Sequence, residues 1–572
     1  MKNNAVRQRL RAFNPLASVA AGNPWDSRLI DLAAINQAPF EGVKALFRQA
    51  AQAPGEPLAA LILGEVGNGK SHLVARWRLA CQSGRKAGGF ALLTPPEGGT
   101  APFCYLLREI ADGLRQPMGQ NSGLSTWHHL AAWLLVVEGQ GKKERSILDD
   151  MRQGRKRGVR WWKGVQDAVS FDRLPPEARS LAKVLVRWLP GSASERREAL
   201  TWLRGEARIL NHLPRRLDRS LYTVEQREEE ARALLLALGA LFAHVGRPLL
   251  VCFDRMEELR TPAQHAAMDQ IVTFLVDRMA ATVPVVLARG QFWEELRQAR
   301  WNAQTVGRLE SNRHELNGCA RAEAELLVRL RLEAVLGSRG MEALFFDPAV
   351  LLERLPAGRN TPRVVLTLAN ARLRELLDLP VTVPETPRQR LDTVWEGMVR
   401  QLPERLREEP LRPERIAQVL RLYLFGEQTS GEQEDSGWIE LPATGSQPAW
   451  LWMVESQFHP KAMIHRLEAG LEWMQHHPGG VVTYVRDGRF VIPRLPKWPE
   501  TNRVVQRFQE QGGRMLHLTP ERALRWYLLG ELHDAVRCGE ITWMDGLNRE
   551  QPVGIATLIE FLRSHFSGET EG

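Results

Sequence analysis

The sequence predicts an α/β fold: a parallel-sheet core with a phosphate-binding loop, a helical insertion and a helical lid, followed by a small C-terminal α/β domain. Three observations predict it. A glycine-rich loop at 64–71 joins an apolar run to a helical pattern. Two further apolar runs, 249–253 and 283–288, have the length of buried strands, and strand and helix patterns alternate beyond residue 437. Such alternation implies parallel strands joined by helices.

The loop has the pattern G-x-x-x-x-G-K-[ST], in which glycines let backbone N–H groups close around phosphate oxygens. Lys70 has the reach to meet the β- and γ-phosphates, and the Ser71 hydroxyl is a ligand for Mg²⁺ at the positive end of the next helix. The apolar run before the loop and the helical pattern after it are the context that this motif requires. The predicted ATP- or GTP-binding residues are Gly64, Glu65, Val66, Gly67, Asn68, Gly69, Lys70, Ser71 and His72.

A carboxylate that faces the metal is expected at the end of a second buried strand. The run 249–253 is followed by Asp254, and a buried strand delivers its last side chain to the carboxyl edge of the sheet, beside the phosphate loop. Asp254 is therefore a predicted Mg²⁺ ligand. Arg255 follows where many ATPases have a catalytic glutamate, which predicts slow hydrolysis, and the next acid is Glu257. Glu257 is expected either to polarise the attacking water or to be a solvated acid at a helix start.

Two later arginines follow in positions where a γ-phosphate is sensed. Arg289 comes directly after the predicted strand 283–288, and Arg363, in the motif NTPR, opens the helical pattern 364–376. This order of phosphate loop, acidic strand, polar-tipped strand and helical lid resembles the AAA+ ATPases, in the branch near the Orc/Cdc6-like and STAND proteins. The resemblance covers about residues 20–380. It implies ATP as the nucleotide, with Arg289 as sensor 1 and Arg363 as sensor 2, so that hydrolysis changes the angle between core and lid.

The same resemblance implies that neighbouring subunits complete each other's sites with an arginine finger. It is expected just before the fifth strand, where Arg308 is the first choice and Arg313 the second. An arginine acting in trans stabilises transition-state charge, so the resemblance implies a homo-oligomer whose ATPase activity depends on assembly. Taken singly, each arginine is more often a solvated residue at a helix end than an arginine finger.

Positive charge is concentrated in one segment of the chain. The formal net charge is +9, and residues 141–220 alone hold 20 Lys and Arg against 10 Asp and Glu. Within this segment basic side chains surround two tryptophans: Arg152, Arg155, Lys156, Arg157, Arg160, Trp161, Trp162 and Lys163. Such a cluster neutralises phosphates while an indole ring stacks on an exposed base, which predicts contact with DNA. The alternative is a solvated helical insertion whose tryptophans pack inward.

The elements of the N-terminal two thirds are assigned from periodicity and from turn signals. Helices have amphipathic 3.6-residue patterns, and the strands are short continuous apolar runs. The expected elements are helix 40–52, strand 58–63, helix 72–81, strand 88–94, helix 102–114, helix 224–245, strand 249–253, strand 283–288 and helix 364–376. The expected domains are an arm (1–40), a nucleotide-binding core (41–305) with the basic helical insertion at about 120–222, a helical lid with a helical extension (306–425), a linker (426–437) and a C-terminal domain (438–572).

The C-terminal domain is predicted either to dock a partner protein or to be nuclease-like. Its expected elements are strand 449–455, helix 460–475, strand 481–486, helix 500–511, strand 514–518 and helix 520–536. The acids of a restriction-type nuclease would be Glu455 with Asp435 or Glu440, but the lysine that such sites use to activate water is missing after Glu455. An active nuclease is therefore disfavoured.

The composition is that of a globular protein with two or three domains, with 572 residues of which 44% are apolar. Its cysteines lie far apart without a C-x-x-C pair, which indicates reduced packing residues. The basic stretch 1–13 lacks the apolar region of a signal peptide, and no apolar run approaches the length of a membrane span. A cytoplasmic protein with no membrane partner is expected.

Three segments, 23–32, 199–207 and 248–259, are similar to ATP-binding proteins of bacterial phage-defence islands such as the BREX systems. This similarity implies a role in anti-phage or anti-plasmid defence and an effector protein of the same system as partner. The leading hypothesis is a DNA-associated, ATP-driven switch or motor that controls this effector. The second is a STAND-like sensor or scaffold with slow hydrolysis that recognises a protein.

Overall fold

A computed structural model represents the 572-residue chain. It describes residues 2–16, 25, 30–83, 87–96, 101–118, 124–138, 143–153, 171–188, 199–205, 223–259, 261–298, 301–378, 386–400, 416, 419–420, 422–423, 438–441, 448–455, 460–487, 498–537, 541–544 and 550–566. The chain divides into two compact units, Met1–Val381 and Thr382–Gly572.

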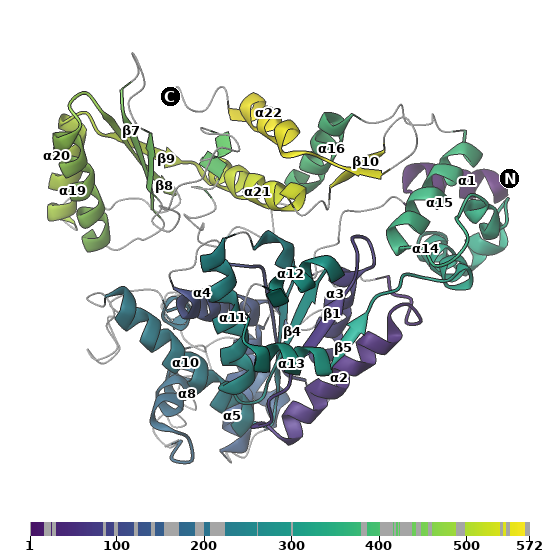
Figure 1. The fold of residues 1–572 in the computed structure, drawn as a ribbon, viewed down its shortest axis with the longest axis horizontal. Helices are drawn as coiled ribbons and strands as arrows, with labels where there is room; N and C mark the ends of the chain where they lie inside the picture. Colours follow the sequence, from purple (N-terminus) through teal and green to yellow (C-terminus); the bar gives the residue numbers. More distant parts are fainter. Residues whose placement is uncertain are drawn as a thin grey trace. The chain divides into compact units, whose positions relative to one another are not determined.

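A five-stranded parallel sheet forms the centre of unit 1, in the order β2-β3-β4-β1-β5. Its strands are β1 (Ala60–Leu63), β2 (Gly89–Leu93), β3 (Leu249–Phe253), β4 (Thr282–Ala288) and β5 (Arg313–Glu315). Strands β4, β1 and β5 are labelled in Figure 1. The α/β class and the parallel core predicted from the sequence are confirmed. Because β1 lies between β4 and β5, the loop that follows β1 leaves the middle of the sheet at its carboxyl edge, where ligands bind in open α/β sheets.

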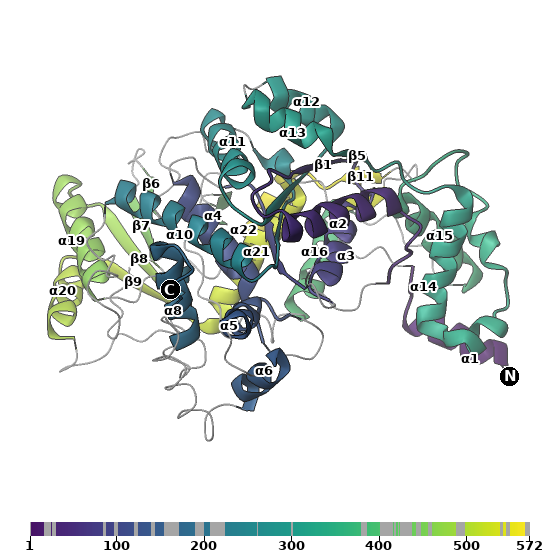
Figure 2. The ribbon, with the colours of Figure 1, turned by 90° about the horizontal axis from the view of Figure 1, so that it is seen from below.

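Helices cover both faces of this sheet, which explains why its inner strands are continuous apolar runs. On one face, side chains such as Ile62 pack with α2 (Gln37–Gln52) and α3 (Lys70–Cys81), which run side by side in Figure 2. On the other face, side chains such as Leu61 pack with three long helices. These helices are α4 (Pro102–Arg115), α10 (Val224–His244) and α11 (Pro262–Asp277).

The described parts of the predicted insertion are helical. They comprise α5 (Thr126–Val137), α6 (Glu144–Gln153) and α8 (Pro176–Trp188). Their apolar side chains join the same core as α4 and α10, with Trp127 and Leu185 buried. The insertion is therefore anchored to the nucleotide-binding core by hydrophobic packing. Residues 154–170, which hold most of the basic cluster, lie outside the described residues.

A separate helical core forms the lid, from α14 (Arg321–Glu342) and α15 (Pro362–Leu376). The N-terminal helix α1 (Lys2–Ala12) packs on α14 and buries Val6 and Leu10 in this core. The first helix of the predicted arm is thus a structural part of the lid. Periodicity alone does not reveal this, because the partner surface of α1 lies more than 300 residues away in the sequence.

Unit 2 is built on a four-stranded sheet in the order β6-β7-β8-β9. Its strands are β6 (Trp438–Leu441), β7 (Trp450–Glu455), β8 (Val481–Asp487) and β9 (Arg514–Leu518). β7, β8 and β9 are parallel, as the alternating pattern predicts, whereas β6 pairs antiparallel with β7 and makes the sheet mixed. Helices α19 (Pro460–His476) and α20 (Pro499–Glu510) share a core with one face of the sheet.

The other face of this sheet is covered by helices from both ends of unit 2, namely α16 (Pro387–Arg400), α21 (Pro520–Arg537) and α22 (Ile555–Phe566). From the sequence, the region of α16 is expected to be a helical extension of the lid. In the structure Leu391 of α16 is fully buried in the core of unit 2, so this helix packs with the C-terminal unit.

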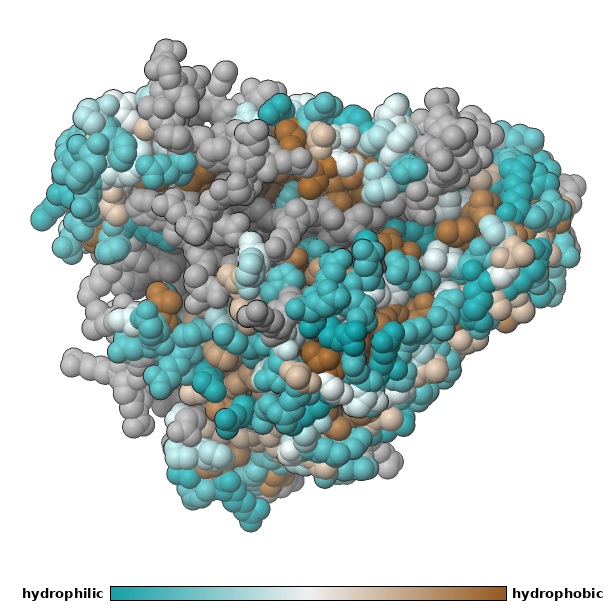
Figure 3. Space-filling model, in the orientation of Figure 1, coloured by the Kyte–Doolittle hydropathy of each residue, from teal (hydrophilic) through white to brown (hydrophobic). Residues whose placement is uncertain are grey.

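The described surface is mostly hydrophilic on the face drawn in Figure 3, with hydrophobic residues in separate small patches. Large apolar side chains that are strongly exposed among the described residues are Phe13, Val136, Val137, Val224, Leu236 and Leu326. Within the described ranges, no helix combines the length and the apolar character needed to cross a bilayer.

Candidate nucleotide-binding site

The phosphate loop turns sharply between β1 and α3. Gly67 and Gly69 have φ angles of 86° and 89°, in the left-handed region that favours glycine. The Lys70 ammonium donates a hydrogen bond to the Gly64 carbonyl at 2.6 Å, so the lysine folds back over its own loop. Asn68 is buried and donates from its side chain to the Leu316 carbonyl at 2.8 Å, which ties the loop to the chain leaving β5.

The two residues predicted to bind Mg²⁺ lie together. The Ser71 hydroxyl donates to Oδ2 of Asp254 at 3.0 Å, and Oδ1 of Asp254 accepts from the Arg255 amide at 2.9 Å. Asp254 is buried at the end of β3. Hydroxyl and carboxylate oxygens are the hard ligands that Mg²⁺ prefers, so this pair fits the ion. Bound Mg²⁺ would neutralise phosphate charge during transfer. No group of three or more His, Cys, Asp and Glu side chains within the described ranges forms another metal site.

Glu257 reaches the phosphate loop because the chain turns back after β3. Arg255 has a φ of 61°, and the short 3₁₀ helix η2 (Met256–Glu258) follows it. Oε1 of Glu257 lies 3.7 Å from Nζ of Lys70 and 3.5 Å from Nε of Arg289, which follows β4. Its side chain is 17% exposed. Glu257 thus lies beside the phosphate loop and is mostly shielded from solvent, and its role in polarising water stays a prediction.

The lid meets the phosphate loop through Arg363. Thr361 caps α15 by accepting a hydrogen bond from the Val364 amide at 3.2 Å, and Pro362 occupies the first turn. This start of the helix brings the Arg363 amide within 3.4 Å of the Gly67 carbonyl. Arg363 therefore stands beside the loop, as the proposed sensor 2 role requires.

Both finger candidates have acidic partners within their own chain. Arg308, on α13 (Ala303–Ser311), forms an ion pair with Asp277 at the end of α11. Arg313, on β5, donates to Glu315 at 2.7 Å and is more exposed. A role in a neighbouring subunit's site remains a prediction for either residue.

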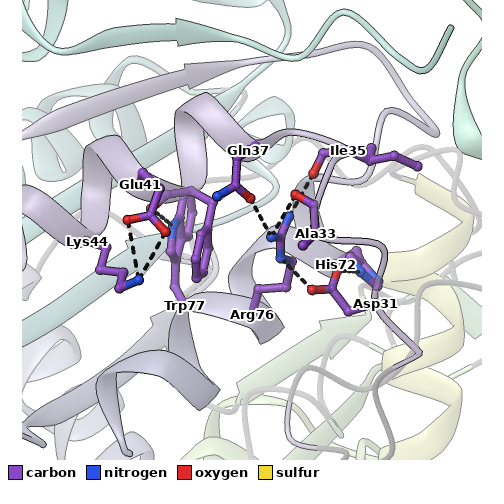
Figure 4. Close-up of polar contacts among 10 residues, drawn as sticks. Asp31, Ala33, Ile35, Gln37, Glu41, Lys44, His72, Arg76 and Trp77 are labelled. Carbon is purple, nitrogen blue, oxygen red and sulfur yellow. Dashed lines mark hydrogen bonds and ion pairs between the residues drawn. The ribbon is translucent and has the colours of Figure 1, made fainter. Parts of the chain in front are cut away.

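Residues of the N-terminal segment also contact the phosphate loop and α3, and no local motif in the sequence identifies them. Asp31 accepts contacts from two side chains of α3, at 3.0 Å from Nε2 of His72 and 3.0 Å from Nε of Arg76 (Figure 4). Arg76 also donates to the Ile35 carbonyl at 2.7 Å, and its side chain is only 5% exposed. Burial lowers the pKa of the Arg76 guanidinium, and the Asp31 carboxylate opposes this shift. The i, i+4 spacing of His72 and Arg76 is the only sequence signal of their shared partner.

Asn36 links the same segment directly to the phosphate loop. Its side-chain amide donates to the Asn68 carbonyl at 3.0 Å, and its backbone is left-handed with a φ of 55°. Trp25, in the predicted arm, packs edge-on against Phe90 of β2. The polar contacts of residues 30–36 thus reach α3 and the phosphate loop, while Leu32 and Ile35 pack with the apolar core of the lid.

Most of the predicted DNA-binding cluster lies outside the described residues: Arg155, Lys156, Arg157, Arg160, Trp161, Trp162 and Lys163. Arg152 lies on α6, near its end. The cluster therefore stays a prediction from the sequence.

The acids considered for a nuclease are not gathered in the described part of unit 2. Asp435 lies outside the described residues, and Glu455 is the last residue of β7. In the antiparallel register Glu440 faces Leu451, four residues from Glu455, which corresponds to about 13 Å along the strand. Glu440 instead accepts a hydrogen bond from the Trp473 indole at 2.9 Å. Glu440 and Glu455 do not form the acid pair of a nuclease site, because they lie at opposite ends of the strand pair.

No protein-family model and no curated protein matches the sequence. A solved structure entitled "Crystal structure of Cdc6p from Pyrobaculum aerophilum" is similar, with 11% sequence identity and a TM-score of 0.29, over 96% of this chain and 98% of that chain. Independently of this similarity, the sheet order and the hydrogen bond between Ser71 and Asp254 place the phosphate loop beside the acidic end of β3.

Proposed function

We propose that this protein binds and hydrolyses ATP with Mg²⁺ as an AAA+ switch or motor. The observation that carries the proposal is the hydrogen bond between Ser71 and Asp254, which joins the phosphate loop to the acidic strand. Lys70 supplies a cation to the phosphates. Arg363 of the lid contacts the same loop, and Arg289 of the core pairs with Glu257, which also pairs with Lys70. ATP rather than GTP rests on the family resemblance.

The switch acts, in this proposal, as a cytoplasmic homo-oligomer that associates with DNA and controls an effector protein in anti-phage or anti-plasmid defence. The basic, tryptophan-containing cluster around residues 152–163 supports DNA contact by its composition. The similarity of short segments to phage-defence proteins supports the cellular role. Unit 2 folds around its own core and offers the surface for a partner.

A second function, a slowly hydrolysing sensor or scaffold for a protein partner, is favoured by one specific feature. Arg255 follows Asp254 where many ATPases have a catalytic glutamate. The nearest acid, Glu257, is engaged in ion pairs with Lys70 and Arg289. A carboxylate held by two cations is not free to orient an attacking water, which favours slow turnover.

The test measures ATP hydrolysis by the full chain with no DNA, with single-stranded DNA and with double-stranded DNA. Lys70→Ala controls for a contaminating ATPase, and a triple charge reversal at Arg155, Lys156 and Arg157 removes the predicted contact. Stimulation by DNA that disappears in the triple variant supports the DNA-associated switch. ATP binding with slow, unstimulated turnover supports the sensor, and no nucleotide binding by the wild-type chain rejects both.

A further inference from the structure

The ion-pair cluster around Glu257 has a consequence for nucleotide selection. One oxygen of this carboxylate lies within 4 Å of two cations that a nucleoside triphosphate also needs, Nζ of Lys70 and Nε of Arg289. Lys70 is 12% exposed and Arg289 35% exposed, so water screens these pairs only partly. A phosphate group and the Glu257 carboxylate are both anions, and they compete for the same two donors.

We propose that Glu257 is a nucleotide-discriminating residue, an internal anion that a γ-phosphate must displace from Lys70 and Arg289. This inference rests on the proposed ATP-binding function. A triphosphate recovers both lost ion pairs, because its β- and γ-phosphates meet the lysine and its γ-phosphate meets the core arginine. A diphosphate disturbs the contact with Lys70 but offers no γ-phosphate to Arg289. Glu257 therefore holds Arg289 in the diphosphate state and releases it in the triphosphate state.

The geometry of the turn after β3 explains why this role falls on Glu257 and not on its neighbour. Glu258, the next residue of η2, has a nearly equal exposure of 18%. Its carboxylate pairs with a different cation, since Oε1 of Glu258 lies 3.8 Å from Nη1 of Arg255. Glu257 and Glu258 are consecutive residues of the 3₁₀ helix η2, which has about three residues per turn, so their carboxylates point in different directions. Glu258 is thus a matched control that carries the same charge, on the same short helix, away from Lys70.

The experiment compares equilibrium binding of a hydrolysis-resistant ATP analogue and of ADP, each with Mg²⁺, to the wild-type chain, Glu257→Gln and Glu258→Gln. Binding is the readout because a loss of hydrolysis in Glu257→Gln would follow from a general-base role as well. For Glu257→Gln we expect the Kd to fall about tenfold for the ATP analogue, equivalent to about 1.4 kcal/mol, but only about threefold for ADP, because ADP disturbs one of the two ion pairs and leaves the other in place. Glu258→Gln is expected to change both values by less than about twofold.

A second variant, Glu257→Asp, distinguishes a loss of the ion pairs from a general folding defect. Glu257→Asp keeps the charge but shortens the side chain by one methylene, so the carboxylate reaches the two cations less well. It is expected to lie between the wild type and Glu257→Gln in its preference for the triphosphate. Equal gains for the ATP analogue and ADP, or equal gains in Glu257→Gln and Glu258→Gln, would overturn the inference. If the wild-type chain binds neither nucleotide, the proposed function itself fails, which is a separate outcome.

Discussion

Arg363 of the lid lies against Gly67 of the phosphate loop. The Arg363 amide approaches the Gly67 carbonyl at 3.4 Å, and a β-carbon added to Gly67 would lie 2.8 Å from Cβ of Arg363. The missing side chain at position 67 is therefore what allows the lid helix to reach the loop. Nucleotide and lid are expected to be coupled through this one contact.

Gly67→Ala should weaken both nucleotide binding and lid docking. The alanine has to adopt a φ of 86°, which costs about 1–2 kcal/mol, and its β-carbon displaces Arg363. We expect the Kd for ATP to rise at least about tenfold and hydrogen exchange to accelerate in the first turn of α15. Gly246→Ala is the matched control, because Gly246 also has a positive φ, of 64°, but has nothing within 4 Å of its added β-carbon. Equal effects of both substitutions on ATP binding would contradict this coupling.

Asp254→Asn tests the predicted metal site. The amide keeps the size of the side chain and removes the negative charge beside Ser71, so affinity for Mg²⁺ should fall. We expect the Kd for Mg²⁺-ATP to rise about tenfold or more, equivalent to at least about 1.4 kcal/mol. ATP binding in excess chelator should change little, or improve, because a repulsive carboxylate is gone. A metal titration monitored by a fluorescent ATP analogue distinguishes these cases, and an unchanged metal dependence would reject Asp254 as a ligand.

Arg11→Ala tests whether the N-terminal helix stabilises the lid. Nε and Nη2 of Arg11 both donate to the Leu377 carbonyl, at 3.1 Å and 2.6 Å, and so cap the end of α15. Losing these charged hydrogen bonds should reduce the free energy of unfolding of the lid by about 1–2 kcal/mol. Faster hydrogen exchange in the last turn of α15 would report it. Arg9→Ala, which removes only a 3.4 Å contact with the Leu336 carbonyl, should have a smaller effect.

The sequence predicts the parts of this molecule that periodicity and local motifs specify. The strands β1, β3 and β4 are recognised because both of their faces are buried, so nearly every side chain in them is apolar. The phosphate loop is recognised because all of the residues that its contacts with phosphate require lie within one stretch of eight residues. The edge strand β5, Arg313–Glu315, is polar and partly exposed, and its sequence carries no strand signal.

Periodicity and local motifs do not predict long-range polar contacts. Arg76 donates hydrogen bonds to the backbone carbonyls of residues 33 and 35. Every residue has a backbone carbonyl, so the sequence does not show which carbonyl accepts. The same holds for the contact of Arg11 with the Leu377 carbonyl, which assigns α1 to the lid. A helix that packs on a distant part of the chain is predicted as a helix, but its partner is not.

Arg308 provides the test of assembly. Its ion pair with Asp277 holds the guanidinium at the end of α13, on the segment from which a finger is expected. If Arg308 completes a neighbouring subunit's site, Arg308→Ala should lower the ATPase rate about 10³-fold or more, the scale of an arginine finger, while ATP affinity stays within about twofold.

Mixing two inactive variants then separates a trans role from a structural one. Lys70→Ala subunits lack a working phosphate loop but keep Arg308, whereas Arg308→Ala subunits keep the loop and lack the finger. In a mixed oligomer, a Lys70→Ala subunit supplies its arginine to the intact loop of its neighbour, so the mixture should be more active than either variant alone. Arg313→Ala, the second choice, serves as the comparison, and the arginine whose loss is rescued by mixing is the finger. If neither variant is rescued, the two arginines act only within their own chain, because a purely local defect cannot be repaired by a neighbouring subunit.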